Sequence, residues 1–187
     1  MLFRSCGPVT SQQPDLVGIE FSSPVGGILA VVTDSPGLTV VALGLTVPRL
    51  SKAQDVLARL SAAESARYRG QSRVASPVES ALRRYFEGDV GALDTLPVEQ
   101  PGGPFRQATW AAMRGIAAGD RWSYSKLAAA AGRPAAVRAA GTACATNRVP
   151  LLVPCHRVVR SDGSLGNYFY GTDVKQWLLR HEGGRDA

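Results

Sequence analysis

Three consecutive residues, Cys155, His156 and Arg157, are the strongest chemical signal in the chain. The thiolate is the reactive form of cysteine, and a neighbouring imidazole or positive charge favours it. Adjacent residues on a strand point to opposite faces, so His156 reaches Cys155 only in a turn or a helical geometry. Pro154 restricts the backbone at that point. The alternative is a buried structural cysteine on an apolar strand.

A carboxylate near the C-terminus is the second signal. Periodicity predicts a helix capped by Thr172 and ended by Gly183, with one face formed by Val174, Trp177, Leu178 and His181. Glu182 falls in the last turn, where the helix dipole disfavours a negative charge. A carboxylate in that place indicates a partner such as an imidazole; the alternative is a solvated surface glutamate.

Helical spacing also precedes these residues. It predicts one helix from Pro104 to Ala118 and a second from Tyr124 to Ala131, capped by Ser123. A third runs from Pro134, in its first turn, to about Ala145. The last two helices, joined by a tight turn containing Gly132, form a candidate helix-turn-helix. Two short helices with a glycine turn also occur in proteins that bind no DNA.

The third helix is almost bare of large side chains, since residues 135, 136, 139, 140, 143 and 145 are alanines and residue 141 is glycine. Small side chains let a backbone approach a neighbouring surface closely. This composition fits either tight helix packing or close approach to a DNA groove, with Arg138 projecting from the middle of the helix.

The N-terminal half has a different pattern. Residues rich in β-branched side chains predict short strands at 17–22, 27–32 and 38–43. Helices are expected near 51–65 and 78–86. The fold class is therefore α/β (α+β): a small domain with an antiparallel sheet and helix, followed by a mostly helical domain.

The predicted domain boundary lies at Glu99–Pro104, where proline and glycine coincide with a switch in charge. Residues 1–103 carry nine Lys/Arg and ten Asp/Glu, whereas residues 104–187 carry twelve Lys/Arg and five Asp/Glu. The expected domains are 1–98 and 99–187. Because the second is strongly basic, a polyanion is its natural partner, although charge alone also serves solubility.

Composition limits the remaining classes. The balance of 45% hydrophobic and 19% charged residues is typical of a soluble globular protein, and no apolar run predicts a membrane span or a secretory signal. The three cysteines, at positions 6, 144 and 155, form no disulfide framework or CxxC pair. We therefore expect a cytoplasmic protein without a bound metal.

The segment from Pro104 to Gly183 closely resembles the 6-O-alkylguanine-DNA alkyltransferases, also called methylated-DNA-protein-cysteine methyltransferases. Its most specific motif is PCHR, at residues 154–157. In order along the chain, the matching residues are Phe105 and Trp110, Ser123-Tyr124, Leu127-Ala128, residues 138–141, Asn147 and Pro150, residues 154–159, residues 166–168 and residues 175–183. The N-terminal half matches more loosely, through residues 23–26 and 84–88.

The resemblance implies an activated nucleophile. Cys155 corresponds to the alkyl acceptor, His156 to the residue that draws the thiol proton through a water, and Glu182 to the carboxylate that polarises it. Asn147 corresponds to a hinge that braces the active-site turn, and Lys175 has a supporting place. Each molecule then acts once, by irreversible transfer and without a cofactor.

The resemblance also implies the partner: double-stranded DNA containing O6-alkylguanine, with the recognition helix in the minor groove. A thiolate cannot reach a base inside the duplex, so the nucleotide must flip out. Tyr124 corresponds to the residue that assists extrusion and donates to guanine, and Arg138 to the finger that fills the gap. Further contacts to DNA or base are expected from Gly141, Ala145, Arg157, Val158, Phe169 and Tyr170. We expect a monomer, with cooperativity on DNA left open.

One loop departs from the family pattern. After Gly166-Asn-Tyr168, many members have two small residues, whereas this chain has Phe169 and Tyr170 before Gly171. The two rings could stack on the base, narrow the pocket against bulky adducts or form a flap; alternatively, they point away. Methyl is therefore the expected substrate rather than benzyl.

Two other functions remain open from the residues alone. A cysteine hydrolase using Cys155 and His156 would turn over, but it needs an oxyanion site that the sequence does not reveal. A binding-only lesion-recognition protein or helix-turn-helix regulator would not need Cys155. Cys6 and Cys144 are either inert or, in the case of Cys144, a second and weaker reactive thiol.

Overall fold

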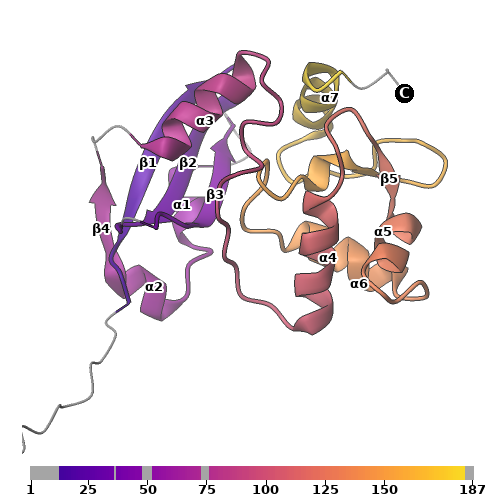
Figure 1. Ribbon diagram of the computed structural model, residues 1–187, viewed down its shortest axis with the longest axis horizontal. Helices are drawn as coiled ribbons and strands as arrows, with labels where there is room; N and C mark the ends of the chain where they lie inside the picture. Colours follow the sequence, from indigo (N-terminus) through magenta and orange to yellow (C-terminus); the bar gives the residue numbers. More distant parts are fainter. Residues whose placement is uncertain (1–12, 36, 48–51, 73–75, 184–187) are drawn as a thin grey trace, which may run out of the picture.

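The computed structural model describes residues 13–35, 37–47, 52–72 and 76–183. A half built on a β-sheet and a half made mostly of helices lie side by side (Figure 1). The mixed α/β class therefore agrees with the prediction. Cys6 lies outside the described residues.

The sheet has four strands in the order β3-β2-β1-β4. β1 (Leu16–Ser23), β2 (Gly26–Thr33) and β3 (Val40–Thr46) are antiparallel neighbours, which confirms the three predicted strands, although β3 begins and ends later than expected. β4 (Tyr68–Gln71), which was not predicted, pairs in parallel with β1 and extends the antiparallel sheet at its edge. The four residues of β4 include no β-branched side chain, and local propensity therefore did not predict this strand.

The helix expected near 51–65 is two short helices, α1 (Ala53–Leu57) and α2 (Ala62–Arg67). Ser61 starts the second helix: its side chain accepts from the Glu64 amide, and the Glu64 carboxylate accepts from the Ser61 amide. This capping box favours a new helix start at Ser61 over continuation of the first helix. The helix expected near 78–86 is present as α3 (Pro77–Phe86).

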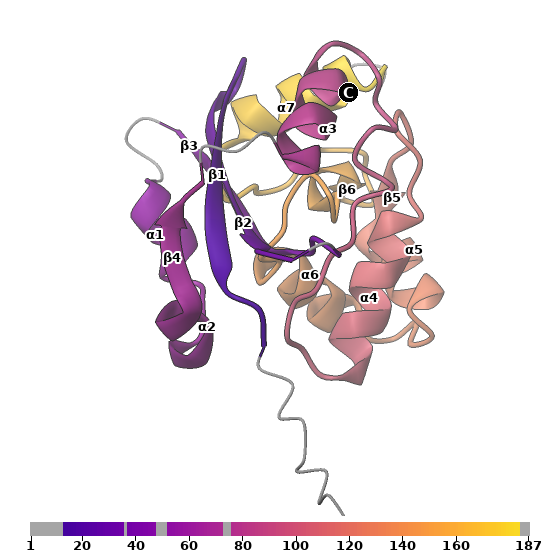
Figure 2. The same cartoon turned by 60° about the vertical axis from the view of Figure 1, so that its left-hand side comes forward.

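Both faces of the sheet are covered. In β2, Leu29 and Val31 belong to a cluster with α1, whereas Ile28, Ala30 and Val32 belong to the larger core. This alternation follows from the two-residue period of a strand. α1 and α2 lie on one side of the sheet, with α3 and the helical half on the other (Figure 2). The larger core includes buried residues of both halves, so the division at residue 98 stays a prediction.

The helical half supplies short elements around the Cys-His-Arg segment. The principal helices are α4 (Pro104–Arg114), α5 (Tyr124–Ala130), α6 (Val137–Ala145) and α7 (Thr172–His181). β5 (Trp122–Ser123) pairs in parallel with β6 (Val158–Val159). This pairing ties the start of α5 to the chain that follows the cysteine.

Several helix ends differ from the predictions. α4 ends at Arg114 rather than Ala118, and α6 begins at Val137 rather than Pro134. α7 is preceded by Gly171, with a φ of 95°, so the expected capping by Thr172 was wrong. The Ser123 cap of α5 is confirmed, because its hydroxyl accepts from the Lys126 amide. None of the helices in the described ranges is long and apolar enough to cross a membrane.

Candidate active site

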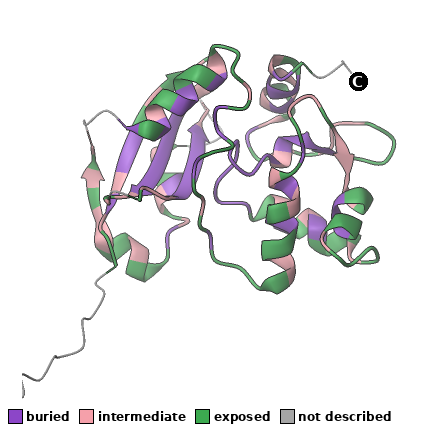
Figure 3. Cartoon of the chain, in the orientation of Figure 1, coloured by how far each residue is buried: buried purple, intermediate pink, exposed green. Residues whose placement is uncertain are grey.

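Cys155 opens a single 3₁₀ turn, η1 (Cys155–Arg157), between Pro154 and β6. The Cys155 amide donates to the Val153 carbonyl at 2.8 Å, and the Arg157 amide donates to the Pro154 carbonyl at 3.0 Å. The segment is therefore a turn rather than a strand, which is the geometry in which the His156 side chain can lie near that of Cys155. The turn lies among the buried segments of the helical half (Figure 3).

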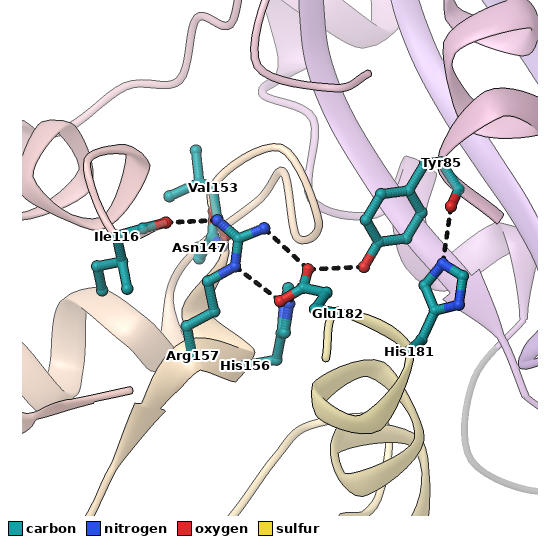
Figure 4. Close-up of polar contacts among 8 residues, drawn as sticks. All are labelled: Tyr85, Ile116, Asn147, Val153, His156, Arg157, His181 and Glu182. Atoms are coloured by element: carbon teal, nitrogen blue, oxygen red, sulfur yellow. Dashed lines mark hydrogen bonds and ion pairs between the residues drawn. The ribbon is translucent and has the colours of Figure 1, made fainter. Parts of the chain in front are cut away.

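Glu182 is the centre of a buried polar network at the end of α7 (Figure 4). Its Oε1 lies 3.0 Å from His156 Nε2 and accepts from the Tyr85 hydroxyl at 2.8 Å. Arg157 donates through Nε and Nη2 to the two carboxylate oxygens, at 2.9 and 2.8 Å. Its Nη1 donates to the Ile116 carbonyl at 2.5 Å. The carboxylate is therefore fully used inside the protein and is not a solvated surface charge.

These contacts set the charges of the network. Burial opposes the charge of Glu182, but His156 and the Arg157 guanidinium outweigh it and hold the pKa of the carboxyl below its ordinary value. Burial lowers the pKa of His156, so its ring is neutral at neutral pH. An ionised Glu182 only accepts hydrogen bonds, which places the histidine proton on Nε2 and leaves Nδ1 as an acceptor. Nδ1 is buried and has no hydrogen-bond partner among the described residues.

Asn147 braces the chain before the cysteine. Its Nδ2 donates to the Val153 carbonyl at 2.7 Å, and its Oδ1 accepts from the Val149 amide at 3.0 Å and from Gln100 Nε2 at 3.2 Å. Because it is buried and fully bonded, the Asn147 side chain fixes the 147–153 loop relative to Cys155.

The Cys155 thiol is protonated at rest. Burial raises its pKa above the ordinary value, while a hydrogen bond with the Asn147 side chain and the charge of Lys175 act in the opposite direction. Burial also lowers the pKa of Lys175, to about 8. A thiol in this state needs a base before it can attack, in contrast to a cysteine that positive neighbours ionise outright.

Cys155 opens into a cavity of about 350 Å³. Its lining residues come from the start of α5, from α6, from the segments around the cysteine and from one turn of the sheet-containing half: Arg59, Tyr124, Gly141, Cys144, Ala145, Asn147, Pro150, Cys155, Asn167, Tyr168, Phe169 and Tyr170. Both aromatic residues that depart from the family pattern thus line the cavity. Phe169 remains 58% exposed, whereas Tyr170 is buried.

α6 borders this cavity and presents small side chains to solvent. Arg138, Ala139, Thr142 and Ala145 are exposed, whereas Ala140 and Ala143 pack inward. The Trp110 indole of α4 donates to the Ala143 carbonyl at 2.9 Å and holds the helix from behind. The pair α5 and α6 therefore has the arrangement of the predicted helix-turn-helix, with Arg138 on its outer side.

Three residues expected near DNA or in support lie inside the protein. Arg157 is 3% exposed and its guanidinium is used by Glu182 and Ile116, so it lies out of reach of DNA in this structure. The Val158 side chain is fully buried and outside the cavity lining. Lys175 donates to the carbonyls of Val158 and Leu165, at 2.6 and 2.5 Å.

The sequence did not single out two residues that reach this site from the first half of the chain. Tyr85 falls in the helix expected near 78–86, and Arg59 falls in the one expected near 51–65. Only the loose match at residues 84–88 drew attention to Tyr85, and no local pattern marks Arg59. Within the described ranges, no group of three His, Cys, Asp or Glu side chains could hold a metal ion.

Comparisons with known proteins agree with this geometry. The family model described as 6-O-methylguanine DNA methyltransferase, DNA binding domain, matches residues 104–184. The methylated-DNA–protein-cysteine methyltransferase of Salmonella typhimurium is 41% identical over 121 residues, covering 63% of this chain and 71% of that protein. The human protein of the same name is 51% identical over 89 residues, covering 48% of this chain and 43% of its own.

A solved structure extends the likeness to both halves. The Mycobacterium tuberculosis OGT in complex with DNA superposes with a TM-score of 0.68 at 26% identity, covering 88% of this chain and 91% of that one. With the buried His156–Glu182 pair and the cavity beside Cys155, these matches identify the chain as a member of the methylated-DNA–protein-cysteine methyltransferase family.

Proposed function

We propose that this protein repairs duplex DNA by transferring the alkyl group of O6-alkylguanine to Cys155, once per molecule. The observation that carries the proposal is the position of Cys155, which lines a cavity and directly precedes His156, the residue that is joined with Arg157 through Glu182. DNA as the partner has independent support from the matched DNA-binding domain and from the relative solved with DNA.

The resting thiol is activated by His156. Its Nδ1 is the free acceptor of the network, and it takes the thiol proton through a water molecule. The imidazolium that forms is stabilised by Glu182, whose charge is already held in place by Arg157. This division of labour is that of a nucleophile, a base and an orienting carboxylate.

The transfer itself is a substitution at the alkyl carbon. The Cys155 sulfur forms a bond to that carbon, the bond from carbon to O6 breaks, and its electron pair leaves with guanine. The proton taken from the thiol ends on guanine, so the products are a neutral base and a thioether. A thioether is stable to hydrolysis in neutral water, so no later step regenerates the cysteine.

The base enters the cavity by flipping out of the duplex. The exposed face of α6 carries small residues, so its backbone can approach the minor groove closely. Arg138 projects from this face and fills the gap in the stack. Tyr124 lines the cavity, and burial raises the pKa of its hydroxyl, which therefore stays protonated and can donate to guanine.

Intact-mass spectrometry after mixing the protein with a duplex containing 6-O-methylguanine tests the proposal. We expect a gain of one methyl group per molecule, located on the Cys155 peptide, with no further reaction once the protein is consumed. Cys155→Ser should gain no mass but still bind the duplex. Turnover without a mass change would instead indicate a cysteine hydrolase, and tight binding without transfer would indicate a recognition protein.

A further inference from the structure

Arg59 is the only described residue before position 99 that lines the cavity beside Cys155. It belongs to the turn between α1 and α2, whereas the other lining residues belong to the helical half. The sheet-containing half therefore contributes a charged side chain directly to the candidate active site.

The turn that carries Arg59 is held firmly. Its amide donates to the Val56 carbonyl at 3.1 Å, and Val56 and Leu60 are both buried in the cluster beneath the sheet. Gly44 of β3 permits this packing, because a Cβ there would lie 2.5 Å from Val56 Cγ2 and 3.0 Å from the Tyr170 hydroxyl. The same strand thus positions the Arg59 turn and the aromatic loop.

Arg59 contacts the loop that carries Phe169 and Tyr170, and it also contacts the backbone of Asn147. Its guanidinium carbon lies 4.5 Å from the centre of the Phe169 ring, a cation–π distance. Its positive charge acts on the Tyr170 hydroxyl, and Nη1 donates to the Asn147 carbonyl at 3.3 Å. The Phe169 and Tyr170 rings meet edge to face, with centroids 5.0 Å apart.

These contacts make one wall of the cavity out of Arg59, Phe169 and Tyr170. Phe169 is 58% exposed, so packing by the helical half alone does not restrain its ring. The guanidinium, anchored on the other half, supplies that restraint. A ring that is pinned cannot swing aside to admit a larger group.

We propose that Arg59 is a specificity-determining residue, which pins Phe169 and so restricts the alkyl groups that reach Cys155 to small ones such as methyl. The inference rests on the proposed function, and it assigns part of substrate selection to the sheet-containing half. The class of substrate it excludes is guanine carrying a bulky O6 group, such as benzyl.

The test measures second-order rates of modification of Cys155 by the free bases 6-O-methylguanine and 6-O-benzylguanine. Free bases have no phosphates, so a role of Arg59 in binding the DNA backbone does not affect these rates. We expect Arg59→Ala to raise the benzyl-to-methyl rate ratio about tenfold or more, the scale on which a pocket distinguishes substrates of different size. Arg83→Ala, which removes an exposed arginine of α3, is the matched control and should leave the ratio unchanged.

Two further variants separate the wall from other roles of the arginine. Phe169→Ala should raise the same ratio, and the Arg59→Ala/Phe169→Ala double variant should add little to either single change, because both open one wall. Arg59→Lys keeps the charge but lacks the planar face, so it should behave like Arg59→Ala. The inference would be overturned if the benzyl-to-methyl rate ratio were unchanged in Arg59→Ala and Phe169→Ala. It would also be overturned if Arg59→Lys kept the ratio of the unmodified protein. If the unmodified protein transferred no methyl group at all, that result would instead contradict the proposed function.

Discussion

The Tyr85 hydroxyl donates a 2.8 Å hydrogen bond to Glu182 Oε1 across 97 positions of the sequence. Tyr85 belongs to α3, which packs on the sheet, and Glu182 follows α7 (Figure 4). The carboxylate that orients His156 is therefore itself held by the other half of the molecule. Together with Arg59, this contact makes the sheet-containing half part of the active-site support.

Tyr85→Phe should separate stability from chemistry. The substitution keeps the buried ring but removes one donor, and Glu182 keeps its contacts with His156 and Arg157. We expect a loss of about 1 kcal/mol in the free energy of unfolding, measured by urea titration, because Oε1 remains hydrogen-bonded. The rate of methyl transfer should stay within about threefold of the rate of the unmodified protein, which corresponds to about 0.7 kcal/mol. A hundredfold loss would mean that Tyr85 takes part in the chemistry.

Glu182→Gln should be far more damaging. It leaves the buried Arg157 guanidinium without its counter-charge, and breaking such a buried pair costs about 3–5 kcal/mol. It also removes the charge that stabilises the His156 imidazolium. We expect both a lower unfolding midpoint in urea and a large loss of transfer rate in the fraction that remains folded. A stable variant with full activity would contradict the network described above.

The protein should lose stability as the pH falls below about 6.5. The pKa of His156 in the folded protein lies below its ordinary value of 6.5, so unfolding takes up a proton below that pH. The pKa of Glu182 is also depressed from 4.5, and its contribution is lost as the pH falls further. Each group lowers the free energy of unfolding with falling pH, by up to about 1.4 kcal/mol per pH unit for a full proton.

Urea titrations at several pH values check this, with NMR titration of the His156 ring as a second measurement. His156→Asn should flatten the dependence between pH 6.5 and 4.5. A His156 ring that titrates at or above 6.5 would contradict the expected sign.

Arg138→Ala should weaken reaction with duplex DNA far more than reaction with the free base. The exposed arginine has no role inside the cavity, which it does not line, but it can replace an extruded base in the stack. Unstacking costs a few kcal/mol, so we expect at least about a tenfold loss on duplex. Rates with free 6-O-methylguanine should change little. Equal losses on both substrates would argue against a finger role.

Cys144→Ala should retain transfer. Cys144 lines the same cavity as Cys155, but burial raises the pKa of its thiol. Cys155 is followed directly by His156, whereas Cys144 has no histidine beside it in the chain. We expect one methyl group per molecule in this variant, as in the unmodified protein. A methyl group mapped to the Cys144 peptide of the unmodified protein would make Cys144 a second acceptor.

Local sequence was sufficient to predict much of the molecule. Segments rich in β-branched residues placed β1, β2 and β3. Helical spacing placed α3 to α7 to within a few residues, since this period reflects which side of a helix is buried. The ends were less certain: Ser61 divided one expected helix, and Gly171 replaced Thr172 as the residue before α7. Short strands such as β4 carry no period of their own and form only because β1 offers a free edge.

The sequence by itself determined the family, because the PCHR segment, Asn147 and Glu182 stand in an order and spacing that are specific to it. Tertiary structure decided how these residues are held. Tyr85 and Arg59 reach the site, and Arg157 turns inward to Glu182 rather than outward to DNA. These contacts join residues 25 to 97 positions apart, and they depend on how two halves pack, which no short-range period in the chain encodes.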